Sequence, residues 1–271
     1  MINIDYRKLR LPVILAAVLV HSATVLAAAD DDTNGGDDSG FTLLSDGPNV
    51  THWGLGAGLG YEESPYTGYG ANFSPLPLVF FDDKWVRFFG NTLDLKVAKW
   101  DGVTLSLRGK YDLGAGYKGS DAPILDDMQT RVGAFWYGPS MNWQTGIGTL
   151  SGDFLTAGSK GRKADIQFGS PFRFGQWTIE PHIGAEWLNN DNVDYYYGVT
   201  SAESRPWRDQ YTGKSSYNFS AGTRFDYRFT PHQNVSLDVG VTRLGSGITD
   251  SPLVDKTVIP QVRLSYLYRF Q

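Results

Sequence analysis

Hydrophobic and polar residues alternate along most of the chain, from Trp53 to the C-terminus. In residues 103–113, one set of alternate positions is apolar and the other is polar or charged. The two sets are Val103, Leu105, Leu107, Gly109, Tyr111 and Leu113 against Thr104, Ser106, Arg108, Lys110 and Asp112. Residues 177–187, 216–229 and 235–242 repeat the pattern. Because successive side chains of a β-strand point to opposite faces, this period of two predicts an all-β chain.

Strand length and aromatic placement distinguish a membrane barrel from a soluble β-sandwich. Alternating segments such as 103–113 and 216–229 are about twice as long as the five or six residues typical of soluble strands. Aromatic residues stand near strand ends, where the aromatic girdles of membrane barrels lie. The polar faces carry charges of both signs, which suits a wet or salt-bridged lumen. The sequence therefore predicts a single antiparallel transmembrane β-barrel in the outer membrane of a Gram-negative bacterium.

We expect about 12 strands, within a range of 10–14, because single-chain bacterial barrels have an even number. The predicted strands are 52–62, 70–81, 84–90, 92–99, 103–113, 129–138, 140–148, 164–172, 176–187, 216–229, 233–244 and 258–270. Residues 149–163 and the triplet 195–197 could add or merge strands. Short periplasmic turns are expected at 82–83, 138–139 and 230–231. The longer connections 114–128, 188–215 and 245–257 are expected to face outside.

The first 50 residues differ from the rest of the chain. Arg7, Lys8 and Arg10 precede the apolar run 11–20, and three alanines follow at 27–29. This order predicts a secretory signal peptide over 1–29, since a membrane-spanning helix needs about 20 apolar residues. Residues 30–50 are acidic and rich in glycine, which predicts a disordered periplasmic tail. Their aspartates lack the spacing of a calcium-binding loop. Residues 51–271 then form the outer-membrane β-barrel.

Composition and charge narrow the possible functions. The chain has no cysteine, so disulfides and thiolate metal sites are excluded, and its acidic balance does not favour nucleic acid. The predicted lumen carries both signs in similar numbers: Asp94, Lys96, Arg108, Lys110, Arg131, Asp165, Glu180, Glu186, Arg224, Asp226, Arg228, Asp238 and Arg263. Selective channels often have a ring of one sign, whereas mixed charges can pair across a packed lumen. Inward glycines at 54, 56, 58 and 60 would leave room beside the first strand, so a narrow pore stays open as an alternative.

Histidine is the main candidate for catalytic chemistry. Beyond the leader the chain has His52, His182 and His232. His182 shares a polar strand face with Glu180 and Glu186, which could orient an imidazole for acid–base work or form an interior charge cluster. No serine has nucleophile spacing, and no His/acid set has metal-ligand spacing. We therefore predict no catalytic, cofactor-binding or metal-binding residues and no cofactor.

Several segments, in order along the chain, resemble the MipA/OmpV family of MltA-interacting proteins. They are the glycine-rich opening 53–66, then 74–79, 87–89, 197–202, 250–254 and the closing 264–270. The resemblance spans about residues 45–270. It implies a non-enzymatic outer-membrane barrel surrounded by lipid. The best-described member is a scaffold that joins a lytic transglycosylase to a murein synthase, so the resemblance implies a scaffolding role with such partners.

Two other functions stay open, a narrow porin-like channel and a surface adhesion or binding protein. Candidate contact surfaces are the tail 30–50, the periplasmic turns and the loop 188–215. That loop contains Tyr195, Tyr196, Tyr197, Arg205, Trp207, Arg208 and Tyr211, and Tyr, Trp and Arg contribute most to binding energy in protein interfaces. The tyrosines could instead belong to an aromatic girdle.

Overall fold

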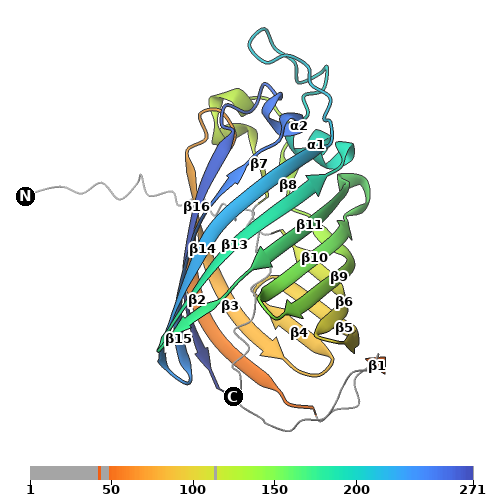
Figure 1. Ribbon diagram of the computed structural model, residues 1–271. Coiled ribbons are helices and arrows are strands. Elements are labelled where there is room, and N and C mark those ends of the chain that lie inside the picture. The colour runs from red at the N-terminus through yellow and green to blue at the C-terminus, as the bar shows by residue number, and fades with distance from the viewer. Residues whose placement is uncertain (1–41, 44–48, 113–114, 271) are drawn as a thin grey trace, which may run out of the picture.

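The computed structural model describes residues 42–43, 49–112 and 115–270 as one antiparallel barrel with a cluster of loops at one end (Figure 1). The barrel strands are β2 (His52–Glu63), β3 (Ala71–Asp82), β4 (Val86–Phe89), β5 (Thr92–Trp100), β6 (Val103–Tyr111), β9 (Phe135–Thr145), β10 (Gly148–Thr156), β11 (Arg162–Gly169), β13 (Trp177–Leu188), β14 (Ser216–Thr230), β15 (Gln233–Arg243) and β16 (Val258–Arg269). Each pairs with its neighbours in the chain, and β16 pairs with β2, so the twelve strands close on themselves. The expectation of an all-β barrel with about 12 strands is confirmed.

Shorter elements decorate this barrel. They are β1 (Thr42–Leu43), β7 (Gly116–Tyr117), β8 (Arg131–Val132), β12 (Phe172–Phe174), α1 (Asn190–Tyr197), α2 (Ser246–Thr249) and the 3-10 turns η2 (Gly119–Asp121), η3 (Pro123–Leu125) and η4 (Gly158–Lys160). β1 pairs with β5, β7 with β8, and β12 with β13. Within the described part of the chain, no helix has the length and apolar character to cross a membrane.

The two ends of the barrel differ. Strands are joined by short turns at residues 83–85, 101–102, 146–147 and 231–232 at the end where β2 begins and β16 ends, here called the turn end. Longer connections cluster at the opposite end, here called the loop end, together with α1, α2, β7 and β8 (Figure 1). The expected turns at 82–83 and 230–231 lie at the turn end, and the three long connections lie at the loop end.

The predicted orientation of the strand faces is confirmed. Leu107 is 55% exposed on the outer face of β6, whereas its neighbour Ser106 is buried. On β14 and β15, Phe219 and Val239 are exposed while Asn218 and Asp238 are buried. An outer belt of large apolar side chains matches the lipid-facing band of membrane barrels. The apolar side chains therefore face outward and the polar ones inward, the reverse of a soluble protein.

The expected turn at Gly138-Pro139 is wrong. Both residues lie inside β9, and the actual turn is at residues 146–147, between β9 and β10. Pro139 has no N–H to donate, and the register between β9 and β10 skips Gly138 and Pro139. The strand β9 therefore continues through these turn-forming residues, and its pairing with β10 is interrupted at them.

This error shifts two predicted strands without changing the total. The predicted strands 129–138 and 140–148 are replaced by β9 and β10, and β10 occupies much of the ambiguous stretch 149–163. Residues 131–132 form β8 in a loop rather than a barrel strand. Residues 195–197, which could have added a strand, are instead the end of α1. The expectations for the leader 1–29 and most of the tail 30–50 lie outside the described residues and stay predictions.

Candidate functional site

The loops at the loop end pack together into a structure with its own hydrophobic core. We call the described residues 64–70, 115–134, 189–215 and 244–257 the cap. Its buried core consists of Tyr66, Tyr69, Tyr117, Ala122, Leu125, Met128, Val199 and Leu253. Loop 115–134 follows β6, and loop 244–257 joins β15 to β16, on the opposite side of the ring of strands. Since loops from opposite walls share one core, that core lies over the barrel opening.

Tyr66 is at the centre of the cap. Its hydroxyl donates a hydrogen bond to the backbone oxygen of Tyr196 at 3.0 Å. Its ring centroid lies 5.0 Å from that of Tyr117 and 5.5 Å from that of Tyr197, which are favourable separations for aromatic pairs. Burial raises the pKa of the Tyr66 hydroxyl well above its ordinary value. Three separate loops are therefore joined through one buried tyrosine.

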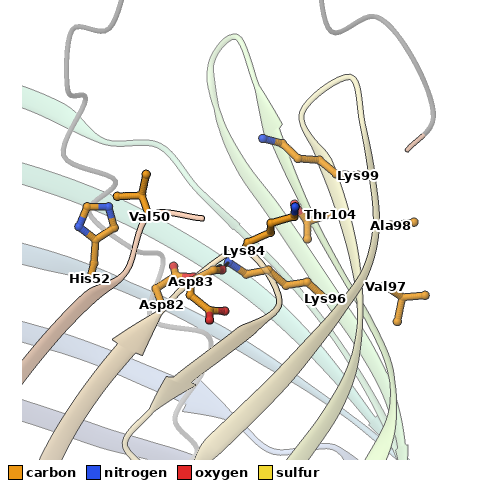
Figure 2. Close-up of a pocket in the computed structure, with 10 residues that line it drawn as sticks. All are labelled: Val50, His52, Asp82, Asp83, Lys84, Lys96, Val97, Ala98, Lys99 and Thr104. Atoms are coloured by element: carbon orange, nitrogen blue, oxygen red, sulfur yellow. Dashed lines mark hydrogen bonds and ion pairs between the residues drawn. The ribbon is translucent and has the colours of Figure 1, made fainter. Parts of the chain in front are cut away.

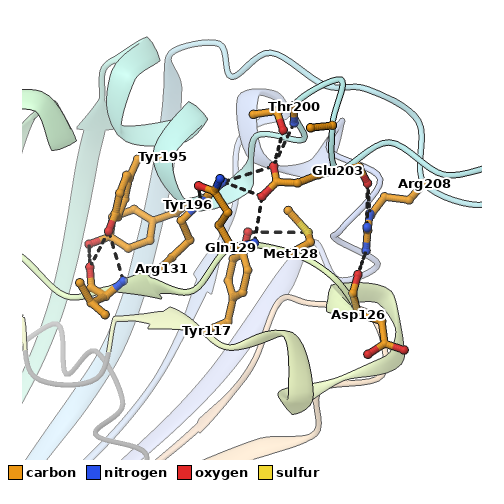
Figure 3. Close-up of polar contacts among 12 residues, drawn as sticks. Tyr117, Asp126, Met128, Gln129, Arg131, Tyr195, Tyr196, Thr200, Glu203 and Arg208 are labelled. Atoms are coloured by element: carbon orange, nitrogen blue, oxygen red, sulfur yellow. Dashed lines mark hydrogen bonds and ion pairs between the residues drawn. The ribbon is translucent and has the colours of Figure 1, made fainter.

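Glu203 links loop 189–215 to loop 115–134 by polar contacts (Figure 3). Its carboxylate accepts hydrogen bonds from the backbone N–H of Gln129 at 3.0 Å and from the hydroxyl of Thr200 at 2.8 Å. Arg131 lies 3.2 Å away and forms an ion pair with it. Burial raises the pKa of Glu203, but these hydrogen bonds and the charge of Arg131 outweigh burial and hold the pKa below its ordinary value.

Arg208 makes the second link between the same loops. It is fully buried, and its guanidinium donates to the backbone oxygens of Glu203, Ile124 and Asp126, the last at 2.9 Å (Figure 3). A planar guanidinium with five donors suits such a fork of carbonyls. Arg208 is one of the residues of the candidate contact loop 188–215, but its donors serve the cap itself.

The tyrosines of α1 have a structural role that the sequence reasoning missed. The helix begins after Asn189, whose side chain accepts a hydrogen bond from the N–H of Asn192 at 3.1 Å. Tyr196 is buried and Tyr197 packs against the cap core. The ammonium of Lys160 lies over the ring of Tyr195, with Nζ 5.0 Å from the ring centre. Trp207 is 67% exposed, and its role in contacts stays a prediction.

Charges in the lumen pair along the barrel wall. Arg108 on β6 lies 2.7 Å from Asp94 on β5 and 2.8 Å from Asp153 on β10. These strands are neighbours or next neighbours in the ring. Arg131, which was expected in the lumen, lies in the cap instead and pairs with Glu203. Arg108 thus meets opposite charges, but its ion pairs run along the wall between nearby strands and do not cross the lumen.

His182 belongs to another wall cluster. Its Nε2 lies 3.1 Å from a carboxylate oxygen of Asp238, and the same oxygen lies 3.5 Å from Nε of Arg224. An added Cβ at Gly222 would come within 2.7 Å of the imidazole ring. These contacts favour the interior charge cluster over an acid–base site. Among the described residues, no group of three His, Asp or Glu side chains is arranged to hold a metal ion.

Gly54, Gly56 and Gly58 of β2 do not leave the room that the sequence suggested. A Cβ added at Gly56 would lie 2.1 Å from the carbonyl oxygen of Tyr266, and one at Gly58 would lie 2.5 Å from that of Leu264. Both oxygens belong to β16. Gly60, in contrast, has space for a Cβ, with its nearest neighbour at 3.8 Å. Glycine is thus required where the first and last strands approach each other closely.

The turn end carries a cavity of about 340 Å³ with a mixed-charge lining (Figure 2). Lys96 forms an ion pair with Asp82 and also donates to the backbone oxygen of Asp83. The Asp83 carboxylate accepts hydrogen bonds from two backbone N–H groups of the turn, at 2.8 and 2.6 Å. Lys84 stacks over the ring of Trp85, and Lys99 is exposed. We call this region the mouth.

Together, the closed ring of strands, the apolar outer belt and the charged lumen define an outer-membrane β-barrel, here one whose loop end is covered by a cap. The family model described as MltA-interacting protein MipA matches residues 55–270. The chain therefore belongs to the MipA family, which confirms the resemblance seen in the sequence.

Individual relatives agree with this family. The MltA-interacting protein of Escherichia coli strain K12 is 29% identical over 242 residues, which cover 84% of this chain and 96% of the relative. Outer membrane protein OmpV of Vibrio cholerae is 28% identical over 189 residues, covering 68% and 70%. The solved structure of outer-membrane expressed OmpT of Vibrio cholerae gives a TM-score of 0.38 at 8% identity, covering 84% of this chain and 100% of that one. The family match and the outer-membrane relative OmpV confirm the predicted location in the outer membrane.

Proposed function

We propose that this chain is a non-enzymatic scaffold of the cell envelope, which binds murein-remodelling enzymes on the periplasmic side. The observation that carries the proposal is the cap. Bacterial barrels have short periplasmic turns and longer extracellular loops, so the cap faces outward and the mouth faces the periplasm. A barrel covered on its outer side offers its periplasmic mouth for contacts.

The relatives support a protein partner. The name of the Escherichia coli relative says that it interacts with MltA, and the alignment covers 96% of that relative. The family resemblance adds a lytic transglycosylase and a murein synthase as the kind of partner to test. The mouth supplies exposed Lys99 and the stacked Lys84, which suit an acidic protein surface.

The wall clusters support a role without catalysis. The one histidine of β13 is held by Asp238, which is also close to Arg224. Arg108 is likewise occupied by two carboxylates. Charged groups held in this way stabilise a barrel wall and do not present a free base or nucleophile to a substrate. The channel alternative is less well supported, because the cap core lies over the opening.

The test is binding of a purified MltA-type transglycosylase to the full chain held in detergent micelles on a surface. We expect the double variant Lys84→Glu and Lys99→Glu to weaken binding at least tenfold, since it reverses two charges at the mouth. The matched control is Lys118→Glu, the same change at an exposed position of the cap, which should leave binding unchanged.

Heat-modifiable migration on gels checks that each variant is folded. Weakening by the cap variant and not by the mouth variant would place the partner on the outer side and overturn the proposal. No binding by the unaltered chain to either a transglycosylase or a murein synthase would remove the scaffold function altogether.

A further inference from the structure

A chamber of about 160 Å³ lies between the cap and the loop-end tips of the strands. Its aromatic walls are Tyr66, Tyr69, Trp136, Tyr196 and Tyr197. Strands β2, β11, β13, β14, β15 and β16 also contribute to the lining. The chamber is separate from the mouth, which lies at the other end of the barrel.

The residues that line the chamber include more acidic than basic side chains. It contains four carboxylates against one ammonium, and these groups are Glu62, Glu63, Asp112, Glu186 and Lys163. Three cations outside the lining act on three of these carboxylates. Lys256 lies 3.5 Å from Glu63, and the charges of Lys110 and Arg263 interact with Asp112 and Glu62. Burial, and after it the charges of Glu186 and Glu62, raise the pKa of the Tyr197 hydroxyl. The charge of Glu186 therefore reaches the aromatic wall, where it favours a cation.

Two buried polar atoms of the lining have no hydrogen-bond partner among the described residues. They are Oδ1 of Asp112 and the hydroxyl of Tyr69, in side chains that are 6% and 8% exposed. The other oxygen of Asp112 accepts from the indole N–H of Trp136 and from the ammonium of Lys163, at 2.5 and 3.2 Å. Because buried polar atoms are nearly always paired in folded proteins, these two atoms suit a ligand with N–H donors.

The chamber already shows how an ammonium is held there. Nζ of Lys163 lies 4.3 Å from the ring centre of Trp136 while it pairs with Asp112. This combines a cation–π contact with a charge-assisted hydrogen bond. A second ammonium would face the charge of Lys163, but Glu186 lies in the same lining to offset it.

We propose that this chamber is a binding site for a small primary ammonium ion. Its N–H groups donate to Oδ1 of Asp112 and to the hydroxyl oxygen of Tyr69, and its alkyl chain lies against Tyr66 and Tyr197. A cavity of about 150 Å³ accommodates a molecule the size of benzene, which limits the ligand to about six non-hydrogen atoms. The site is distinct from the proposed partner-binding mouth and does not depend on it.

The test uses n-butylammonium as the probe and 1-butanol as its neutral counterpart. Binding to the full chain in detergent micelles is measured by titration calorimetry and by saturation-transfer NMR. We expect saturable binding of the ammonium with one site per chain and no saturable binding of the alcohol, since the alcohol lacks the charge. Equal behaviour of the two probes, or no binding of either, would overturn the proposal.

Variants locate the site. Asp112→Asn removes the charge at constant size and should weaken n-butylammonium binding at least tenfold. Tyr69→Phe removes only the unpaired hydroxyl and should weaken it at least threefold. The matched control is Asp127→Asn, the same change at a cap side chain that is 75% exposed, and its affinity should stay unchanged. If Asp112→Asn does not fold, Tyr69→Phe decides the question. Equal affinity in Tyr69→Phe and the unaltered chain, or equal loss in Asp127→Asn, would contradict this site.

Discussion

Replacing Arg208 by alanine should open the cap while the barrel stays folded. Arg208 is fully buried and donates to backbone oxygens of both long loops, those of Glu203 in its own loop and of Ile124 and Asp126 in the other. Alanine cannot donate to any of these oxygens. The strands are paired with one another independently of this residue, so the loss falls on the packing of loop against loop.

The magnitude follows from the three carbonyl acceptors. A hydrogen bond to a charged group contributes about 1.5–3 kcal/mol, and the released carbonyls regain some hydration when the cap opens. We therefore expect the free energy of cap opening to fall by about 4 kcal/mol, which is about a thousandfold in the opening equilibrium. Arg208→Lys should lose less, because lysine keeps the charge but not the planar fork.

Hydrogen exchange in detergent micelles measures this opening directly. The N–H groups of Val199 and Tyr211 are useful reporters, because each donates to the backbone oxygen of the other residue within loop 189–215, at 2.8 and 3.0 Å, and Val199 is buried in the cap core. Their exchange should accelerate about a thousandfold in Arg208→Ala, and amides between β14 and β15 should be unaffected. Unchanged exchange at Val199 and Tyr211 would refute the role of Arg208. Equal acceleration in the barrel strands would refute the independence of cap and barrel.

Three further predictions test the membrane face, the closing seam and the cap. Leu107→Arg, which places a charge on the 55% exposed outer face, should reduce the stability of the inserted barrel by about 2–4 kcal/mol near the bilayer midplane, measured by reversible urea unfolding in lipid vesicles. Gly56→Ala should cost about 1–3 kcal/mol, because its Cβ would meet a carbonyl of β16, whereas Gly60→Ala should cost less in the same assay. The pKa of Glu203 is held low in the folded cap, so its pairing with Arg131 stabilises the cap above the ordinary glutamate pKa of about 4.3 and is lost as pH falls through the lower folded value. The protection factors of cap amides, which correct for the intrinsic pH dependence of exchange, should therefore fall in acid, and Glu203→Gln should abolish that fall.

The barrel could be predicted because its pattern is local. A strand that faces lipid on one side and a wet lumen on the other must alternate, and Leu107 next to Ser106 shows that alternation directly. Boundaries are correct to within one residue where turn residues stand between alternating segments, as at Thr230, the last residue of β14.

The sequence misled where turn-forming residues stand inside a strand. Gly138 and Pro139 read as a turn, yet β9 continues through them. Apolar side chains point outward at alternate positions both before and after them, as Phe135 and Trp143 show. The β2 glycines misled in a similar way. Their inward placement was predicted, but the closeness of β16 depends on pairing between the two ends of the chain.

The cap could not be predicted because its contacts join distant segments. Arg131 and Glu203 are 72 residues apart, and Ile124 and Arg208 are 84 residues apart. Neither loop has a repeating pattern, so the aromatic and arginine residues within them fitted a partner surface as well as an internal core. A long loop that contains large apolar residues such as Leu125 is the one sequence feature that indicates a cap.

Single-channel recording of the full chain in a planar bilayer tests the central claim, that the cap closes the loop end of this outer-membrane barrel. The unaltered chain, shown by heat-modifiable migration to be folded, should be silent at neutral pH, and Arg208→Ala should produce stepwise openings. Steady openings of the unaltered chain with the same conductance as Arg208→Ala would contradict the closed cap and make the protein a channel.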